Sequence, residues 1–274
     1  MMKKNADVVV IGGGVHGCAI AYFLARKGWK NILLLEKKYL ASGATGRSAA
    51  GIRHQYGTEI NIRLSSASVQ RMERLEEELE YSESIELMQG GYLMLAYSEE
   101  ELELFRNNVK LQKKIGPNNE TVILSPEEIK EMFPHLNLEG VWGASFNPRD
   151  GHANPFHVTQ AFARAARRLG VEIRTGVEVT DITKEGNKIT GVVTNTGEKI
   201  NTPVVVNAAG SHGKLLGKMV GLDIPITPER HQLLVTEPLE MFLKAMVISF
   251  KHGTYFKQTP HGSLLLGVGD PEHE

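Results

Sequence analysis

The stretch from residue 7 to residue 36 constrains the fold of this chain more than any other. It opens with a short apolar run rich in valine, typical of a central parallel strand covered on both faces, and residues 12–17 then read Gly-Gly-Gly-Val-His-Gly. In such a GxGxxG sequence the first glycine permits a tight turn, the second lets main chain approach a pyrophosphate, and the third lets a helix pack on the strand. The sequence therefore predicts strand, glycine turn, helix and strand, with phosphates bound at the helix N-terminus.

Glu36 identifies the class of nucleotide. It stands at the end of the second predicted strand, 32–35, and follows Gly17 by 19 positions. A carboxylate at this distance accepts hydrogen bonds from a ribose and repels a 2′-phosphate, which favours FAD or NAD over NADP. The helix between the strands is expected over 15–27, with Gly28 as its C′ residue. A glycine turn without a nucleotide is the less favoured alternative, because strand, helix and acid are all present.

Composition argues against several other classes of protein. The chain has 274 residues, enough for two domains or one large one, and a net charge of -1 gives no sign of nucleic acid or an anionic membrane as partner. Its one cysteine, Cys18, cannot build a disulfide framework or a cysteine-based metal site, and it is expected to pack against the sheet in a cytoplasmic protein. None of the ten histidines has metal-ligand spacing, and no stretch is long enough for a membrane span or a signal peptide.

The rest of the sequence predicts an α/β nucleotide domain interrupted by a second domain. Residues 39–55 are rich in Gly, Ala and Ser and carry Arg47 and Arg53, which favours close approach to a bulky ligand with positive charge beside it. A single helix is expected over 60–80. The predicted nucleotide domain comprises residues 1–85 and 148–225, and the predicted second domain comprises residues 86–147 and 226–274.

With these segments in order, the chain resembles the FAD-dependent oxidoreductases of the D-amino-acid oxidase and sarcosine oxidase superfamily. Within it, the chain is most similar to sarcosine oxidase, glycine oxidase and the β subunits of dye-linked proline dehydrogenases. The matching segments are 10–14 through Glu36, 42–45 with 51–54, 150–151 with 154–155, 177–179, 207–210 and 262–267. The resemblance implies an α/β fold with a Rossmann-like FAD-binding domain of the GR2 type and a discontinuous, mainly β-sheet substrate domain, here incomplete.

The resemblance also implies how FAD would be held. Gly12, Gly14 and Gly17 would hold the pyrophosphate and Glu36 the adenosine ribose, while segment 42–51 would run under the flavin. Main chain of Val179 would touch adenine, and the turn at 209–210 would close over the phosphates. The expected cofactor-binding residues are Gly12, Gly14, Val15, His16, Gly17, Glu36, Lys37, Ser42, Thr45, Ser48, Ala50, Gly51, Val179, Ala209 and Gly210.

Arg53 is the predicted substrate anchor. It aligns with an arginine that holds the substrate carboxylate in sarcosine oxidase, and a guanidinium offers the planar fork that fixes a carboxylate through two bonds. The alternative is a structural arginine bonded to loop carbonyls. Tyr255 and Lys257 lie on a strand that the family uses for its substrate wall, although an exposed strand face is equally compatible with them. His54 is either a pocket residue or a satisfied loop histidine, and the second reading is favoured.

The predicted reaction is oxidation of a secondary or primary amine of a small amino acid, such as sarcosine, glycine, proline or a D-amino acid, by hydride transfer to flavin. Oxidases of the family carry a lysine in the strand matching 262–267, where this chain has Leu264, Leu265 and Leu266, so a dehydrogenase with an acceptor other than oxygen is expected. Family members also continue beyond the position of Glu274. A shortened chain, a split gene product and a degenerate paralogue all stay open.

Two other functions remain as alternatives. One is a flavin-binding subunit or fragment that has no turnover of its own and needs a partner chain, and a homo-oligomer is also compatible with the sequence. The other is an NAD-dependent Rossmann enzyme, which the hairpin strands predicted between 177 and 200 and segment 42–51 disfavour.

Overall fold

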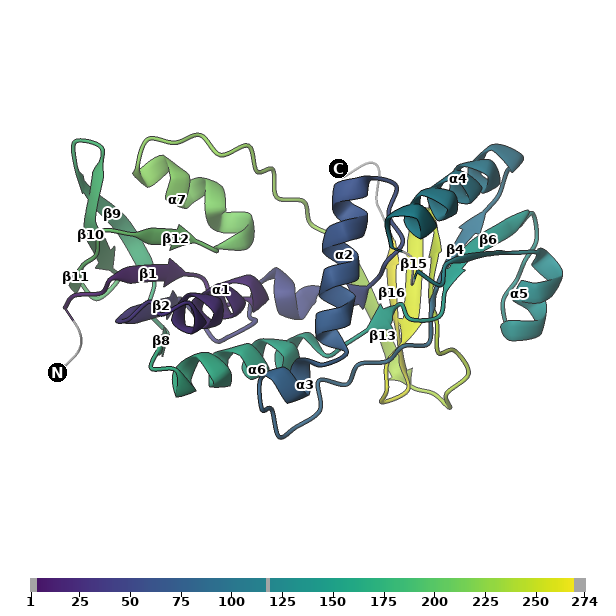
Figure 1. Ribbon diagram of the computed structural model, residues 1–274, viewed down its shortest axis with the longest axis horizontal. Coiled ribbons are helices and arrows are strands. Elements are labelled where there is room, and N and C mark those ends of the chain that lie inside the picture. Colours follow the sequence, from purple (N-terminus) through teal and green to yellow (C-terminus); the bar gives the residue numbers. More distant parts are fainter. Residues whose placement is uncertain (1–3, 117–118, 269–274) are drawn as a thin grey trace. The chain divides into compact units, whose positions relative to one another are not determined.

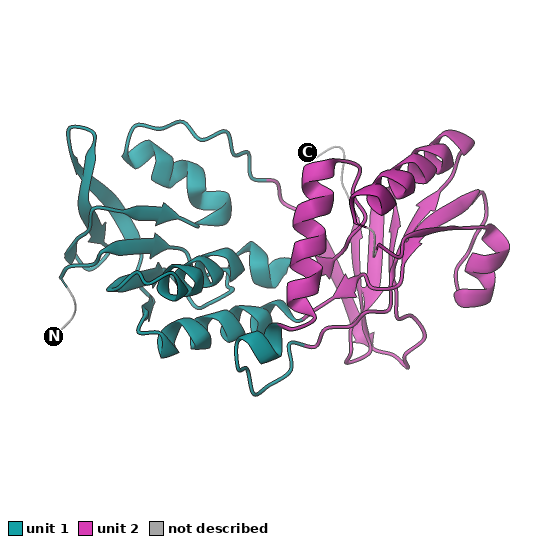
Figure 2. Cartoon of the chain, in the orientation of Figure 1, with its two compact units in different colours: residues 1–48, 75–85, 154–228 teal, residues 49–74, 86–153, 229–274 magenta. Residues whose placement is uncertain are grey.

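A computed structural model of the protein describes residues 4–116 and 119–268 (Figure 1). The chain forms two compact units, each built from three separate stretches (Figure 2). Unit 1 comprises residues 1–48, 75–85 and 154–228, and unit 2 comprises residues 49–74, 86–153 and 229–274.

Unit 1 is built on a parallel sheet in the order β12-β1-β2-β8. Its strands are β1 (Val8–Ile11), β2 (Ile32–Glu36), β8 (Glu172–Thr175) and β12 (Val205–Asn207). Helices α1 (Val15–Arg26) and α6 (Pro155–Arg168) pack on each other through Tyr22, Phe23 and Phe162. An antiparallel sheet of β9 (Val179–Glu185), β10 (Lys188–Thr194) and β11 (Lys199–Asn201) completes the unit, together with α3 (Leu75–Glu78) and α7 (Gly213–Met219).

The core of unit 1 explains the apolar strands. Val9, Ile11, Leu33 and Leu35 share one hydrophobic cluster with residues of the antiparallel sheet and α7. The alternate residues Val8, Val10 and Leu34, which point to the other face, are also buried. Both faces of β1 and β2 are therefore covered, as the continuous apolar runs predict.

Unit 2 is built on a seven-stranded mixed sheet in the order β13-β16-β15-β14-β4-β6-β5. The strands are β4 (Tyr92–Ala96), β5 (Val122–Leu124), β6 (Gly143–Asn147), β13 (Gln232–Pro238), β14 (Met246–Ser249), β15 (Thr254–Gln258) and β16 (Ser263–Val268). Helix α4 (Glu99–Ile115) packs through Leu102 and Phe105 on a cluster with Met94, whereas α5 (Pro126–Met132) packs through Ile129 on a cluster with Leu93. Successive residues of β4 point to opposite faces, so the two helices cover opposite faces of the sheet.

Two expectations about the chain between 49 and 85 are wrong. The single helix expected over 60–80 is two, because α2 (Glu59–Met72) ends before α3 begins at Leu75. Residues 49–74, expected in the nucleotide domain, belong to unit 2. The same is true of residues 148–153. The physical reason is that β3 (Gly51–Ile52) pairs with β7 (Gly151–His152) and that α2 packs on α4. The change of unit at 85/86 lies where the sequence predicts it.

The α/β class with a parallel Rossmann-like sheet and a second, mainly β unit is confirmed. Within residues 4–116 and 119–268, no helix combines the length and apolar character needed to cross a bilayer.

Candidate functional site

The turn between β1 and α1 excludes side chains at two of its predicted glycines. Gly12 has φ +114°, and a Cβ there would lie 2.4 Å from the carbonyl oxygen of Ala208. A Cβ on Gly17 would lie 1.9 Å from the carbonyl oxygen of Gly12. Close approach of main chain therefore requires glycine at both positions. Glycine at position 17 lets α1 pack on the turn.

The N-terminus of α1 opens into a cavity of about 960 Å³. Its N-cap, Gly14, receives no side-chain capping bond in the described part of the chain, and the first turn carries no acidic residue. The amide of Val15 donates to Thr45 Oγ1 at 3.2 Å. Main-chain groups of Gly14, Val15 and His16 and the positive end of the helix dipole lie at this space, which is the arrangement that a pyrophosphate needs.

Glu36 lies at the edge of the same cavity and is 9% exposed. Its Oε2 accepts from the amide of Gly13 at 2.7 Å, and its Oε1 accepts from the amide of Lys38 at 2.8 Å and from Ser42 Oγ at 3.3 Å. An ionised carboxylate has about four acceptor positions, so capacity remains for a ribose hydroxyl. The protein groups fix the carboxylate in place, and the ribose assignment stays a prediction.

A second, smaller cavity of about 120 Å³ adjoins Glu36. It is lined by Leu35, Val177, Val179 and, from α7, Leu216 and Met219. Apolar walls of this kind suit a flat aromatic base. The contact between Val179 and adenine also stays a prediction.

Most predicted cofactor residues line these two cavities. Those on the larger one are Gly12, Gly14, Val15, His16, Glu36, Lys37, Ser42, Thr45, Ala209 and Gly210, and Val179 lines the smaller one. Ser48 is exposed and its Oγ donates to the carbonyl of Thr45, while Ala50 and Gly51 belong to unit 2. Arg47, expected from the sequence to lie beside the ligand, lines the larger cavity, whereas Asn207 and His212 were missed as lining residues. Asn207 could have been found, because a polar residue ends the predicted strand there.

In unit 2, Arg53 lies over two tyrosine rings. Its Cζ is 4.6 Å from the ring centre of Tyr56 and 5.7 Å from that of Tyr92. Within residues 4–116 and 119–268 the guanidinium has no ion pair or hydrogen bond. The alternative, an arginine bonded to loop carbonyls, is therefore not supported by any such bond there. Cation–π contacts hold the side chain in place without using its donors. The donors are left for an anionic ligand.

Arg53 borders a cavity of about 380 Å³ between α4 and the sheet. Met94, Leu104, Phe105 and Phe250 give it an apolar wall, and the polar residues on it include Gln55, Glu101 and Asn108. The same wall carries Gln112, which is 2% exposed and whose Oε1 has no hydrogen-bond partner in the described chain. An orphaned buried acceptor beside an apolar cavity is a group that a ligand could satisfy. No sequence signal marks Gln112, because it belongs to a long polar helix.

Tyr92 supports the arginine as a neutral platform. Burial raises the pKa of its hydroxyl to about 12, although Arg53 acts in the opposite direction. The main chain passes closely over it, since a Cβ on Gly51 would lie 2.8 Å from Tyr92 Oη. The hydroxyl therefore stays protonated at neutral pH.

Tyr255 and Lys257 do not line the cavity beside Arg53. Tyr255 lies over Gly267, where a Cβ would meet its ring at 2.1 Å. Lys257 is only 6% exposed and pairs directly with Leu265 of β16, so the alternative of an exposed strand face is wrong for this lysine. Burial lowers its pKa to about 8, with Glu86 opposing the shift.

His152 lies near Lys257 and is 1% exposed, with neither ring nitrogen hydrogen-bonded by normal geometry in the described chain. Burial lowers its pKa to about 4; the charge of Lys257 acts in the same direction, while the main chain of Gln258 and Glu86 oppose it. His152 is therefore neutral at pH 7.

Among residues 4–116 and 119–268, no group of three His, Cys, Asp or Glu side chains could hold a metal ion. Cys18 is fully buried, and burial raises the pKa of its thiol to about 12, so its predicted packing role is confirmed.

A family model described as FAD dependent oxidoreductase matches residues 7–274. The chain belongs to this family. FAD is the family's cofactor, and the unit 1 cavities with their open helix terminus fit it.

Relatives of this flavoprotein support the predicted resemblance. The chain is 36% identical over 273 residues to sarcosine oxidase subunit beta of Arthrobacter sp, a match covering 97% of this chain and 66% of the relative. It is 34% identical over 271 residues to the mitochondrial dimethylglycine dehydrogenase of Rattus norvegicus, covering 97% of this chain and 31% of that protein. The chain thus spans about two thirds of the first curated relative and about a third of the second.

Solved structures agree with this assignment. The L-proline dehydrogenase from P. horikoshii superposes with a TM-score of 0.89 at 39% identity, covering 98% of this chain and 71% of that one. The glycine oxidase from Geobacillus kaustophilus gives a TM-score of 0.86 at 28% identity, with 97% and 72% covered. The resemblance predicted from the sequence is confirmed at the level of the family.

Proposed function

We propose that this chain is an FAD-dependent enzyme that oxidises the amine of a small amino acid. The relatives are named for sarcosine, dimethylglycine, proline and glycine, which all carry an amine on the carbon next to a carboxylate. Bound FAD supplies the chemistry by accepting a hydride from a carbon bonded to the amine nitrogen. The observation that carries the proposal for this chain is the guanidinium of Arg53, which borders a cavity and, within the described residues, has ring contacts but no hydrogen bond or ion pair.

Unit 1 supplies the cofactor site in this proposal. The turn at Gly12 and Gly14 and the amides at the start of α1 take the pyrophosphate, and Glu36 takes the ribose. The smaller cavity beside Val179 takes the adenine. The other proposed contacts in this unit are Val15, His16, Gly17, Lys37, Ser42, Thr45, Ser48, Ala209 and Gly210. Ala50 and Gly51, which belong to unit 2, are proposed from the family resemblance alone.

Unit 2 supplies the substrate anchor. The guanidinium of Arg53 binds the carboxylate through two parallel hydrogen bonds and so fixes the neighbouring carbon. The apolar lining of the cavity excludes water from the rest of the substrate. An amine that binds neutral needs no dedicated acid or base, so we assign none; Tyr255 and Lys257 remain proposed wall residues.

The test of the anchor is Arg53→Lys. The change keeps the charge but loses the planar fork, so KM for an amino-acid substrate should rise by about tenfold or more, equivalent to ~1.4 kcal/mol. The visible spectrum of the flavin should stay unchanged. Arg63→Lys, an exposed arginine on α2 that pairs with Glu59, is the matched control. Amines without a carboxylate should respond little to either change. Unchanged KM in Arg53→Lys, or loss of the flavin, would remove Arg53 from the substrate site.

The proposed acceptor is a carrier other than oxygen, because β16 has leucines where related oxidases have a lysine. One observation favours an oxidase as the second candidate. Lys257 on β15 pairs directly with Leu265 on β16, so the neighbouring strand carries a lysine amino group in the same part of the sheet. Turnover could also require a partner chain, since the Arthrobacter relative is a subunit. A cytoplasmic location, supported by the single cysteine, completes the proposal.

A further inference from the structure

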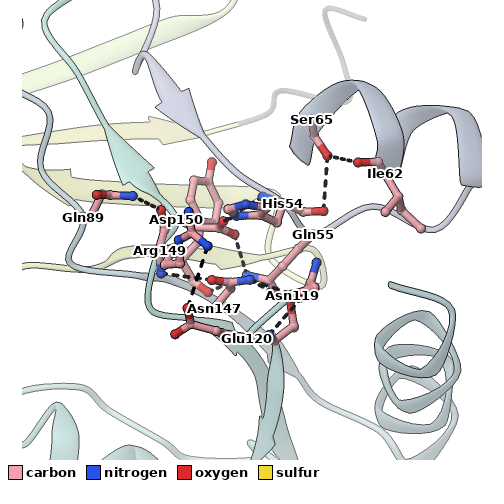
Figure 3. A network of polar contacts seen from close by, with 12 residues as sticks. His54, Gln55, Ile62, Ser65, Gln89, Asn119, Glu120, Asn147, Arg149 and Asp150 are labelled. Atoms are coloured by element: carbon pink, nitrogen blue, oxygen red, sulfur yellow. Dashed lines mark hydrogen bonds and ion pairs between the residues drawn. The ribbon is translucent and has the colours of Figure 1, made fainter. Parts of the chain in front are cut away.

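We infer that Asp150 is a positioning residue that holds the substrate-anchoring arginine, Arg53, in place. The inference rests on the proposed function and names the group that makes the anchor precise. Asp150 is completely buried and lies 96 positions from His54, the residue that follows Arg53. Figure 3 shows Asp150 and His54 facing each other in a network of polar side chains.

The segment after Arg53 is bound to this one carboxylate by three hydrogen bonds. Asp150 Oδ1 accepts from the amide of His54 at 2.7 Å and is also 2.7 Å from His54 Nδ1. Asp150 Oδ2 accepts from Gln55 Nε2 at 3.1 Å. Hydrogen bonds to a buried charged group are stronger than neutral ones, so the main chain next to Arg53 has one preferred position.

Gln55 connects the same clamp to the platform of the arginine. Its Nε2 also donates to the carbonyl of Tyr92 at 2.8 Å, and its Oε1 accepts from Ser145 Oγ at 2.5 Å. Tyr92 is one of the two rings beneath Arg53. Gln55 and Asp150 therefore fix the positions of the arginine segment and of its supporting ring relative to each other.

The turn that carries Asp150 is itself fixed. Its amide donates to the carbonyl of Asn147 at 3.2 Å, and its carbonyl accepts from the amide of Gly91 at 2.9 Å. Next to it, Arg149 forms a bidentate pair with Glu73 at 2.6 to 3.0 Å. Glu73 also accepts from Gln89 Nε2 at 2.8 Å. It is therefore a carboxylate with several donors in the same network that, within the described residues, forms no hydrogen bond or ion pair with residues 53–55.

This arrangement matters because, among residues 4–116 and 119–268, no carboxylate forms an ion pair with Arg53 to orient it. A guanidinium on a flexible stem must be held within about 0.5 Å of its working position for a two-bond contact with a carboxylate. Its ring contacts limit the side chain, and Asp150 fixes the main chain from which that side chain starts. Loss of the carboxylate should therefore act on ligand binding mainly through Arg53, and the cycle below separates this from any effect through Gln55, which also lines the cavity.

The experiment measures binding of a carboxylate to the full FAD-loaded chain by titration calorimetry. The probe is tetrahydrofuran-2-carboxylate, which has no oxidisable amine, and its neutral carboxamide is the ligand control. Asp150→Asn keeps the shape but places an amide donor against Gln55 Nε2. It should weaken binding of the carboxylate by about tenfold and leave binding of the carboxamide within twofold. Glu73→Gln makes the same chemical change in the same network and should leave both affinities unchanged.

A double-mutant cycle decides whether Asp150 acts through Arg53. Arg53→Met alone should lower the affinity for the carboxylate probe more than Asp150→Asn does. Adding Asp150→Asn to Arg53→Met should change that affinity less than twofold. If Asp150→Asn does not fold, His54→Ala, which removes a partner of the same carboxylate and does not line the cavity, replaces it in the cycle, with a smaller loss in the same direction. An equal effect of Asp150→Asn with and without Arg53, or no effect in the parent, overturns the positioning role. Unchanged carboxylate binding in Arg53→Met overturns the anchor itself, and so the proposed function, by a separate result.

Discussion

Lys257 gives the sharpest test of the energetics of unit 2. Its pKa falls from 10.5 to about 8 because burial disfavours the charged amine. Each pH unit of such a shift corresponds to 1.36 kcal/mol, so the charged lysine lowers the free energy of unfolding by up to about 3 kcal/mol. Lys257→Met keeps an unbranched side chain that is one atom shorter and has no charge. We therefore expect the variant to be more stable than the parent at pH 7 by up to about 3 kcal/mol.

The pH dependence separates this effect from simple repacking. Below pH 8 the lysine is charged in the folded and unfolded chains, and the full destabilisation is present. As the pH rises from 8 to 10.5, the folded chain loses the proton first, and the parent gains stability relative to the variant. Urea unfolding followed by circular dichroism at pH 7 and pH 10.5 measures the difference. Lys244→Met, which removes an exposed lysine of the same unit, should change stability little. A Lys257→Met chain no more stable than the parent at pH 7 would refute the reasoning.

Two further predictions concern the cofactor and the electron acceptor. Glu36→Ala should weaken FAD binding by about one to two orders of magnitude, because charge-assisted hydrogen bonds of about 1.5–3 kcal/mol are lost; an unchanged affinity, measured by equilibrium dialysis, would remove Glu36 from the ribose site. The reduced protein should reoxidise slowly in air and rapidly with an artificial dye when mixed in a stopped-flow instrument. Peroxide release at the rate of dye reduction, abolished in Lys257→Met, would instead establish the oxidase and assign Lys257 to it.

The nucleotide half of the molecule could be predicted because its signals are local. Gly12, Gly17 and Glu36 lie within one strand, turn, helix and strand unit, and each is required by a contact inside that unit or immediately beside it. The strands of the second half were also predictable, since β14, β15 and β16 each have a continuous apolar or β-branched stretch. Local pattern determines such elements with little help from the rest of the chain.

The substrate half could be predicted only in part, because its contacts join distant residues. Asp150 and His54 are far apart in sequence, and nothing in the glycine-rich stretch before Arg53 shows that it belongs with β7 and the large sheet. The orphaned acceptor on Gln112 depends on how α4 packs, which polarity alone does not reveal. Lys257 reads as a surface residue until its strand is placed inside the sheet.

The visible absorption spectrum of the purified chain, recorded before and after adding candidate amino acids without oxygen, tests the central claim most directly. Our account predicts a bound flavin band that bleaches at a much lower concentration of a secondary or primary amine bearing an α-carboxylate than of the corresponding amine that lacks the carboxylate. A flavin band that no amino acid bleaches would contradict the proposed turnover and leave a flavin-binding subunit. A chain that binds no flavin at all would contradict the assignment of FAD as its cofactor, on which the proposed function depends.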